Sequence, residues 1–154
     1  MMSARAALVL LCSVAVLALL AVCPVAHAQR PAATGAAYVV IVHPGVGAQS
    51  LDRKFLEDVF LKRITSWSDG QVIHPADLAP DSAVRRAFTR DVLNRSVEAV
   101  KGYWQQRIFS GRDVPPPEFP HDDDVVQYVE HHEGGIGYVS GGAHVGGCRV
   151  VGVQ

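Results

Sequence analysis

The segment from Asp81 to Arg85 has the residue types that bind an oxyanion. Such a ligand needs convergent donors: backbone N–H groups at the start of a helix, hydroxyl groups and often an arginine. Ser82 would supply a hydroxyl and the start of a helix, Ala83 a free backbone amide, and Arg85 a positive charge. Asp81 can accept a hydrogen bond from a protonated phosphate, whereas it would repel an anion without a proton. Ser82 is therefore the centre of our first candidate site.

A second candidate site lies in the stretch 45–50, which ends at Ser50. Gly47 would let the backbone approach a ligand closely, and Ser50 is expected to open a helix. Both sites also have a purely structural explanation. Ser50 and Ser82 are typical helix N-caps, each worth about 1 kcal/mol. Arg85 is then an ordinary residue of a solvated helix face.

Metal binding and nucleophilic catalysis have weaker support in the sequence. The segments 121–124 and 131–133 are rich in His, Asp and Glu, but adjacent histidines point apart and the chain has no His-Glu-x-x-His motif. Neither Gly-x-Ser-x-Gly nor a Gly-Lys-Ser/Thr phosphate loop occurs. We therefore expect no catalytic residue, no metal site and no cofactor, and we expect the protein not to be an enzyme.

Alternating strand and helix patterns indicate the elements that would hold these residues. Residues 38–42 form a β-branched run typical of a buried strand, and apolar residues from 51 to 60 recur at helical spacing. Residues 71–73 are a short strand candidate. Helices are expected to begin at Ser82, at Ser96 and after Asp122. Residues 135–139 and 150–153 are further strands, and the proline-rich stretch 111–120 is an extended loop. This order predicts an α/β domain.

The amino terminus predicts export from the cytoplasm. Arg5 precedes an apolar run over residues 6–22, and Ala-His-Ala at 26–28 fits a signal-peptidase site. We therefore divide the chain into a signal peptide (1–28), a flexible segment (29–37) and one domain (38–154). Two alternatives are a membrane anchor and a lipoprotein attached at Cys23. The expected location is periplasmic or secreted.

Charge and cysteine content narrow the class of protein further. Lys and Arg together number 14 against 15 Asp and Glu, a net charge of −1. This balance argues against a nucleic-acid-binding protein, which usually has a strong basic excess. Cleavage after residue 28 would leave Cys148 as the single cysteine, so no internal disulfide is expected. We expect Cys148 to be a small packing residue.

Several of these segments, in order, resemble the PstS-like phosphate-binding proteins of ABC transporters. The resemblance rests mainly on Phe-Leu-x-Arg-Ile-Thr-x-Trp at 60–67 and Gly-Ile-Gly-Tyr-Val at 135–139, with Asp-Ser at 81–82 between them. It implies the type II periplasmic-binding-protein fold, a small mixed sheet flanked by helices. It also implies a non-enzymatic protein of the cell envelope that recognises phosphate or a related oxyanion and works with an ABC transporter.

The departures from the family pattern leave other functions open. The resemblance implies two lobes with the ligand between them, whereas this chain has room for little more than one. The family's Asp-Ser-Gly-Thr loop reads Asp-Ser-Ala-Val at 81–84, so the glycine and threonine are missing. An alternative function is therefore a ligand-free interaction module, or a half that pairs with itself as a homodimer. A metal-dependent enzyme is a third.

Overall fold

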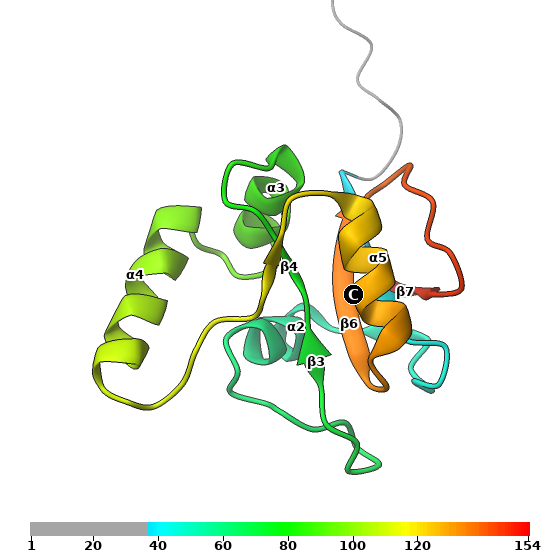
Figure 1. Ribbon diagram of the computed structural model, residues 1–154, viewed down its shortest axis with the longest axis horizontal. Coiled ribbons are helices and arrows are strands. Elements are labelled where there is room, and N and C mark those ends of the chain that lie inside the picture. Colours follow the sequence, from blue (N-terminus) through cyan, green and yellow to red (C-terminus); the bar gives the residue numbers. More distant parts are fainter. Residues whose placement is uncertain (1–36) are drawn as a thin grey trace, which may run out of the picture. The chain divides into compact units, whose positions relative to one another are not determined.

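The computed structural model describes residues 37–154, and the statements below concern this part of the chain. The predicted signal peptide and nearly all of the segment 29–37 lie outside the described residues. The same holds for the residues on which the two alternatives, a membrane anchor and a lipoprotein attached at Cys23, depend. Figure 1 shows helices on both sides of a central sheet, with α5 packed across strand β6.

The sheet has five strands in the order β2-β7-β1-β6-β3. They span Ser50–Leu51 (β2), Arg149–Val153 (β7), Tyr38–Val42 (β1), Gly135–Ser140 (β6) and His74–Pro75 (β3). Strand β1 runs antiparallel to both of its neighbours, whereas β2 is parallel to β7 and β3 is parallel to β6. The other four strands therefore run in one direction and the central strand β1 runs in the opposite direction, which confirms the predicted small mixed sheet.

The register of β1 against β6 defines the two ends of the sheet. Tyr38 pairs with Ser140 and Val42 pairs with Ile136. Val42 and Ile136, like most residues of these two strands, are fully buried, because helices cover both faces. We call the end marked by Tyr38 and Ser140 the Ser140 end of the sheet.

Four helices surround the sheet, three of them at the predicted starts. They are α2 (Arg53–Phe60), α3 (Ala83–Asp91), α4 (Val97–Phe109) and α5 (Asp122–His131). Ser82 and Ser96 are the N-caps of α3 and α4, as predicted: their hydroxyls accept hydrogen bonds from the amides three residues on, at 3.3 and 3.1 Å.

The predicted N-cap at Ser50 is wrong. Helix α2 begins after Asp52, whose carboxylate accepts a hydrogen bond from the Phe55 amide at 2.7 Å. Ser50 instead lies in β2, where it pairs with Gly152, and its hydroxyl accepts a hydrogen bond from the Gln154 side chain at 3.1 Å. The carboxylate of Asp52 caps a helix as well as a serine hydroxyl does. Because Ser50 and Leu51 pair with β7, they stay extended, and the helix begins only after them.

One strand prediction and one loop prediction also change. Residues 71–73 form only an isolated bridge, between Val72 and Ser66, and the strand next to β6 is displaced to His74–Pro75. The stretch 111–120 is not loop throughout: it ends in strand β5 (Glu118–Phe119), which pairs with β4 (Asp77–Leu78). A proline cannot donate a ladder hydrogen bond, but the carbonyl of Pro117 still accepts one from the Asp77 amide at 2.9 Å.

An aromatic cluster fills the space between α2, α3 and the sheet. Phe88 stacks on Tyr138 with ring centroids 3.8 Å apart, and Phe60 meets Phe88 edge-on at 4.8 Å. All three side chains are at most 1% exposed. On the other face, a Cβ at Gly137 would lie 2.6 Å from Cγ1 of Val125, so glycine lets α5 approach β6 closely. Both contacts fix the helices relative to the Ser140 end of the sheet.

The corrected N-cap of α2 leads to a simple prediction. Asp52→Ala should lower the free energy of unfolding by about 1 kcal/mol, because the Phe55 amide loses its acceptor. Ser50→Ala should change it by less than about 0.5 kcal/mol, because Ser50 is exposed and caps no helix. Urea unfolding followed by circular dichroism measures both. A larger loss for Ser50→Ala than for Asp52→Ala would contradict the assignment.

Candidate functional site

A pocket of about 420 Å³ lies where α3 and α5 begin, and we call it the α3–α5 pocket. Pairing of β4 with β5 brings the residues before α3 beside those before α5, and Ser140 ends the neighbouring strand β6. The N-terminal ends of both helices therefore meet at the Ser140 end of the sheet (Figure 1). The lining residues are Leu78, Ser82, Val84, Pro120, His121, Asp122, Asp123, Ser140, Ala143 and His144.

The two helix starts offer backbone donors to this pocket. Amides in the first turn of a helix have no intrahelical acceptor, and the helix dipole makes this end positive. In α3 the Ser82 hydroxyl caps the Arg85 amide, which leaves the amides of Ala83 and Val84 without an intrahelical partner. The N-cap of α5, His121, makes no side-chain cap hydrogen bond. Both ends can therefore donate hydrogen bonds to an anion or to water.

The side chains of the pocket are acidic and imidazole groups rather than cations. Asp122 and Asp123 contribute carboxylates, His121 and His144 contribute imidazoles, and no Lys or Arg is among the described residues that line it. One carboxylate is already engaged, because Asp122 accepts a hydrogen bond from the Ser140 amide at 3.2 Å. Asp123 is free to accept a hydrogen bond from a ligand. This combination of donors and acceptors suits an oxyanion that carries a proton.

Arg85 does not serve this pocket, and its assignment to a solvated helix face is wrong. The residue is 3% exposed, and its guanidinium forms an ion pair with Asp77 and a 2.8 Å hydrogen bond to the Leu78 carbonyl. Glu118 is a more distant partner at 3.6 Å. Arg85 lies three residues before Phe88, so both side chains are on the same face of α3. Both are buried, and Arg85 therefore points inward, towards β4.

Tyr138 completes this buried cluster, because its hydroxyl also donates to the Asp77 carboxylate. Burial raises the pKa of the Asp77 carboxyl to about 6, although the charge of Arg85 and the Tyr138 hydrogen bond both act to lower it. Burial likewise raises the pKa of Tyr138 well above its ordinary value. The cluster of Asp77, Arg85 and Tyr138 is thus a structural contact in the interior, and it fixes the start of α3.

The buried ion pair gives a prediction about stability. Asp77→Ala should lower the free energy of unfolding by about 3–5 kcal/mol, because it leaves the Arg85 charge buried without its main partner. Glu118→Ala is the matched control: its side chain is 41% exposed and should contribute less than about 1 kcal/mol. Urea unfolding of the two variants provides the comparison, and equal losses would show that Asp77 is not the main partner.

The side chains of the remaining predicted site residues do not line the α3–α5 pocket. Asp81 and Ala83 are exposed next to Ser82 but do not line it, and the Asp81 carbonyl accepts a hydrogen bond from Arg86 at 2.7 Å. Gly47 lies between the carbonyls of Val46 and Ala48, both of which accept from Arg149. Arg149 pairs with Val42, so Gly47 is at the opposite end of the sheet from Ser140.

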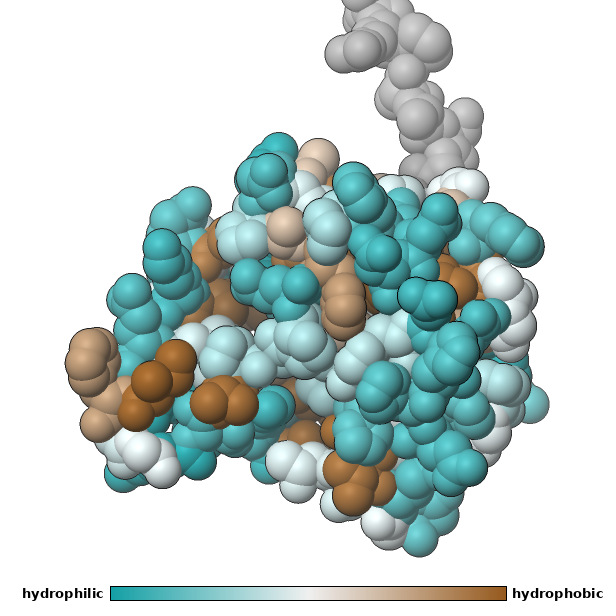
Figure 2. Space-filling model, in the orientation of Figure 1, coloured by the Kyte–Doolittle hydropathy of each residue, from teal (hydrophilic) through white to brown (hydrophobic). Residues whose placement is uncertain are grey.

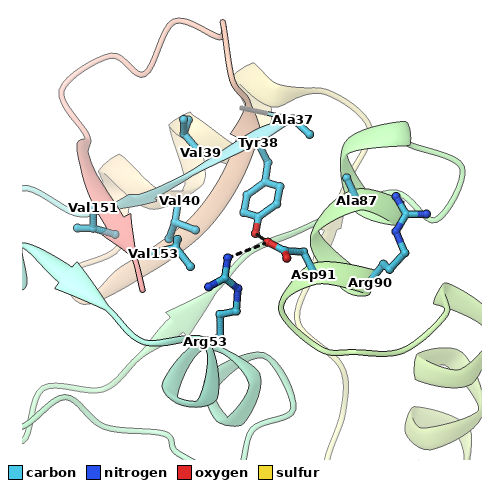
Figure 3. A pocket seen from close by; sticks show the side chains of 10 residues that line it. All are labelled: Ala37, Tyr38, Val39, Val40, Arg53, Ala87, Arg90, Asp91, Val151 and Val153. Carbon is cyan, nitrogen blue, oxygen red and sulfur yellow. Dashed lines mark hydrogen bonds and ion pairs between the residues drawn. The ribbon is translucent and has the colours of Figure 1, made fainter. Parts of the chain in front are cut away.

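A second pocket, of about 590 Å³, contains two arginines, one of which is paired with a carboxylate (Figure 3). Its arginines are Arg53 and Arg90, above a floor of β1 and β7 residues. Arg53 is paired with Asp91 at 3.5 Å, and Asp91 also accepts a hydrogen bond from the Tyr38 hydroxyl. That hydrogen bond is the main cause of the lowered pKa of Asp91. Figure 3 shows the three polar side chains directed at one another.

Metal binding, membrane insertion and cysteine chemistry add no second site in the described residues. Between residues 37 and 154, no three His, Cys, Asp or Glu side chains are grouped so as to hold a metal ion. In the same range, no helix combines the length and apolar character needed to span a membrane. Cys148 is buried, as expected of a packing residue, and burial raises the pKa of its thiol to about 11.

Sequence reasoning missed most of the side chains that line the α3–α5 pocket. It named Ser82, but it considered the acidic start of α5 and His121 only as possible metal ligands and gave Ser140 no role. The signal in the sequence was the run of acids after Pro120. This run lies beside Ser82 only because β4 pairs with β5. Strands of two residues are too short for the sequence to indicate such a pairing.

Comparison with known proteins supports the resemblance inferred from the sequence. No protein-family model matches the chain. The phosphate-binding protein PstS of Xylella fastidiosa strain Temecula1 is 28% identical over 124 residues, which cover 72% of this chain and 34% of the relative. PstS of strain 9a5c gives the same values. The chain thus spans about a third of the length of these curated relatives.

Solved structures give the same result for the fold. A putative phosphate ABC transporter substrate-binding protein with bound phosphate, from Clostridium perfringens, matches with a TM-score of 0.60 and 18% identity, over 76% of this chain and 44% of that one. PstS from Borrelia burgdorferi matches with a TM-score of 0.60 and 14% identity, over 77% and 47%. The predicted fold, one lobe of a periplasmic-binding-protein-like α/β architecture, is confirmed.

Proposed function

Because this chain is PstS-like over its described lobe, we propose that it binds inorganic phosphate, or a related oxyanion, in the α3–α5 pocket. One observation carries the proposal: two helix N-termini and the Ser82 hydroxyl meet in a pocket at the Ser140 end of the sheet. Relatives named for phosphate binding, one of them solved with phosphate bound, support this choice of ligand.

The charges of the pocket favour phosphate over sulfate. Near neutral pH phosphate retains a proton, which a carboxylate such as Asp123 can accept in a hydrogen bond, whereas sulfate has none to donate. The amides of α3 and the Ser82 hydroxyl would bind the other oxygens. The lobe would bind its ligand without changing it, so we propose a non-enzymatic role.

We further propose that the chain works outside the cytoplasm and delivers its ligand to an ABC transporter. The apolar run and the Ala-His-Ala motif before residue 29 support cleavage of a signal peptide at that point. Residues 38–154 then form a single domain, with 29–37 as its leading segment. The names of the relatives support the transporter as partner.

One observation favours a second candidate function, a ligand-free interaction module in the cell envelope. Arg85, the cation nearest to Ser82 in the sequence that we expected to help bind an anion, is held in the buried cluster, and the pocket has two carboxylates. An anion would therefore rely on backbone donors, the hydroxyls of Ser82 and Ser140, and the imidazoles. The two functions differ in whether any anion binds.

Calorimetric titration of the dialysed protein with phosphate distinguishes them. Saturable binding is expected, and Ser82→Ala should weaken it at least fivefold, about 1 kcal/mol, because one donor is lost. Ser50→Ala is the matched control and should leave the affinity unchanged, since Ser50 does not line the pocket. An unfolding curve for each variant confirms that it is folded at the titration temperature. If phosphate, sulfate and molybdate at millimolar concentration all give no heat of binding, the proposal of anion binding is wrong and the interaction module is the remaining function.

The role of the free carboxylate is tested by selectivity. Asp123→Asn should narrow the ratio of phosphate to sulfate affinity by roughly tenfold, because the amide no longer repels sulfate and can donate to it. Asp124→Asn is the matched control: this residue follows in α5 but does not line the pocket. An unchanged ratio in Asp123→Asn would show that another group discriminates between the anions.

A further inference from the structure

Three arginines surround a hollow of about 340 Å³ between the end of α3 and the start of α4, and we call it the arginine pocket. Arg86 and Arg90 belong to α3, and Arg95 lies directly before the N-cap of α4. The other lining residues are Asn94, Ser96, Val97 and Glu98. Figure 2 shows hydrophilic side chains over this end of α4 and apolar ones at its far end, at the lower left. The arginine pocket shares no residue with the α3–α5 pocket.

These three arginines have no acidic side chain as a partner. None of them forms an ion pair with an Asp or Glu of residues 37–154, and Arg86 donates instead to the Asp81 carbonyl at 2.7 Å. The residues before 37 cannot supply a partner, because the first acidic residue of the chain is Asp52. Other cations of the lobe are paired, namely Arg53, Lys54, Lys62, Arg63, Arg85 and Arg107. Unpaired positive charge is therefore concentrated at this pocket.

The spacing of the arginines opposes the stability of α3. Arg86 and Arg90 are four residues apart, which makes them neighbours on one helix face, and like charges at this spacing destabilise a helix. Both residues are exposed, so packing in the core does not explain them. The first turn of α4, whose amides form the positive end of the helix dipole, borders the same pocket. A bound anion would relieve this repulsion.

Glu98 offsets part of this charge and shows that the start of α4 stabilises a carboxylate. Hydrogen bonds from its own backbone amide and from Ser96, together with the charge of Arg86, lower the pKa of its carboxyl. Glu98 is the one acid among the described residues that line the pocket. Three arginines against one glutamate leave the lining with a charge of +2. The pocket therefore favours an anion with more than one negative charge.

We propose that the arginine pocket binds a compact polyanion of the oligophosphate class, a molecule with two or more linked phosphate groups. A guanidinium presents paired N–H donors that match the oxygens of a phosphate group. Three guanidiniums exceed what one phosphate group needs, whereas linked groups can engage all three. The volume of about 340 Å³ is within the range of small-molecule pockets, about 300–1,000 Å³. This pocket is separate from the phosphate site proposed above, and neither proposal depends on the other.

Calorimetric titration of the dialysed protein with tripolyphosphate tests the proposal. Saturable binding is expected, and Arg95→Gln should raise the Kd by roughly fivefold or more, because one guanidinium is lost. Arg112→Gln is the matched control: it removes the same charge from an exposed position that does not line the pocket, and it should leave the Kd nearly unchanged. No saturable binding at about 1 mM tripolyphosphate, or equal effects of the two variants, would overturn the proposal.

Removal of the acid in the pocket should have the opposite effect. Glu98→Gln should lower the Kd for tripolyphosphate by roughly threefold or more, because the ligand no longer meets a negative charge at the start of α4. Glu133→Gln is the matched control, since Glu133 is exposed and does not line the pocket. Weaker binding by Glu98→Gln, or the same Kd as Glu133→Gln, would contradict binding at this place.

Ser82→Ala separates the arginine pocket from the α3–α5 pocket, because Ser82 lines only the second of the two. This variant should leave the Kd for tripolyphosphate unchanged, and Arg95→Gln should leave any binding of inorganic phosphate in the α3–α5 pocket unchanged. An unfolding curve for each variant confirms that it is folded. If Ser82→Ala weakens tripolyphosphate binding as much as Arg95→Gln does, the polyanion does not have a pocket of its own and the proposal is wrong.

Discussion

An arginine in a protein interior needs partners for its charge and for its donors, and Arg85 finds its main partners in strand β4. Its guanidinium pairs with Asp77 and donates to the carbonyl of Leu78, both in β4, while Tyr138 of β6 donates to the same carboxylate. The pair therefore ties α3 to the small β4–β5 ladder and, through Tyr138, to the main sheet. Because this contact is buried, it holds the start of α3 in place, and Ser82 at that start lines the α3–α5 pocket.

The same contact decides the chemistry of that pocket. An arginine one turn after a helix start would usually be available to an anion, but here its charge is used in the interior. The pocket keeps the backbone donors of two helices, two hydroxyls and a set of carboxylates and imidazoles. Under the proposed function, its selectivity would come from hydrogen-bond geometry and from the protons of the ligand, rather than from net positive charge.

Much of the fold could be predicted because local patterns determine it. The β-branched run at 38–42, the glycine-framed run at 135–139 and the serine caps of α3 and α4 each act through neighbouring residues, and each was predicted correctly. Ser50 shows where local reasoning fails. Serine and aspartate cap helices equally well, and pairing of Ser50 with Gly152, about a hundred residues away, decided between Ser50 and Asp52.

The site was less predictable than the fold, for a related reason. The inward turn of Arg85 depends on Asp77, eight residues earlier, being buried beneath α3, and the meeting of Ser82 with His121 depends on a ladder of two-residue strands. Neither strand has a periodicity long enough to detect. The resemblance to phosphate-binding proteins supplied what local patterns could not, namely the expectation that Asp81-Ser82 begins a ligand loop.

Helix α3 is held along its whole length, and this restricts how the lobe can move. Its first turn carries Arg85, its middle carries Phe88 stacked on Tyr138, and its last residue, Asp91, accepts a hydrogen bond from Tyr38. A helix held at three points on the sheet cannot tilt without breaking contacts of several kinds at once. Hydrogen exchange of its central amides should therefore require opening of most of the lobe, and the phosphate binding proposed for Ser82 should proceed without rearrangement inside the lobe.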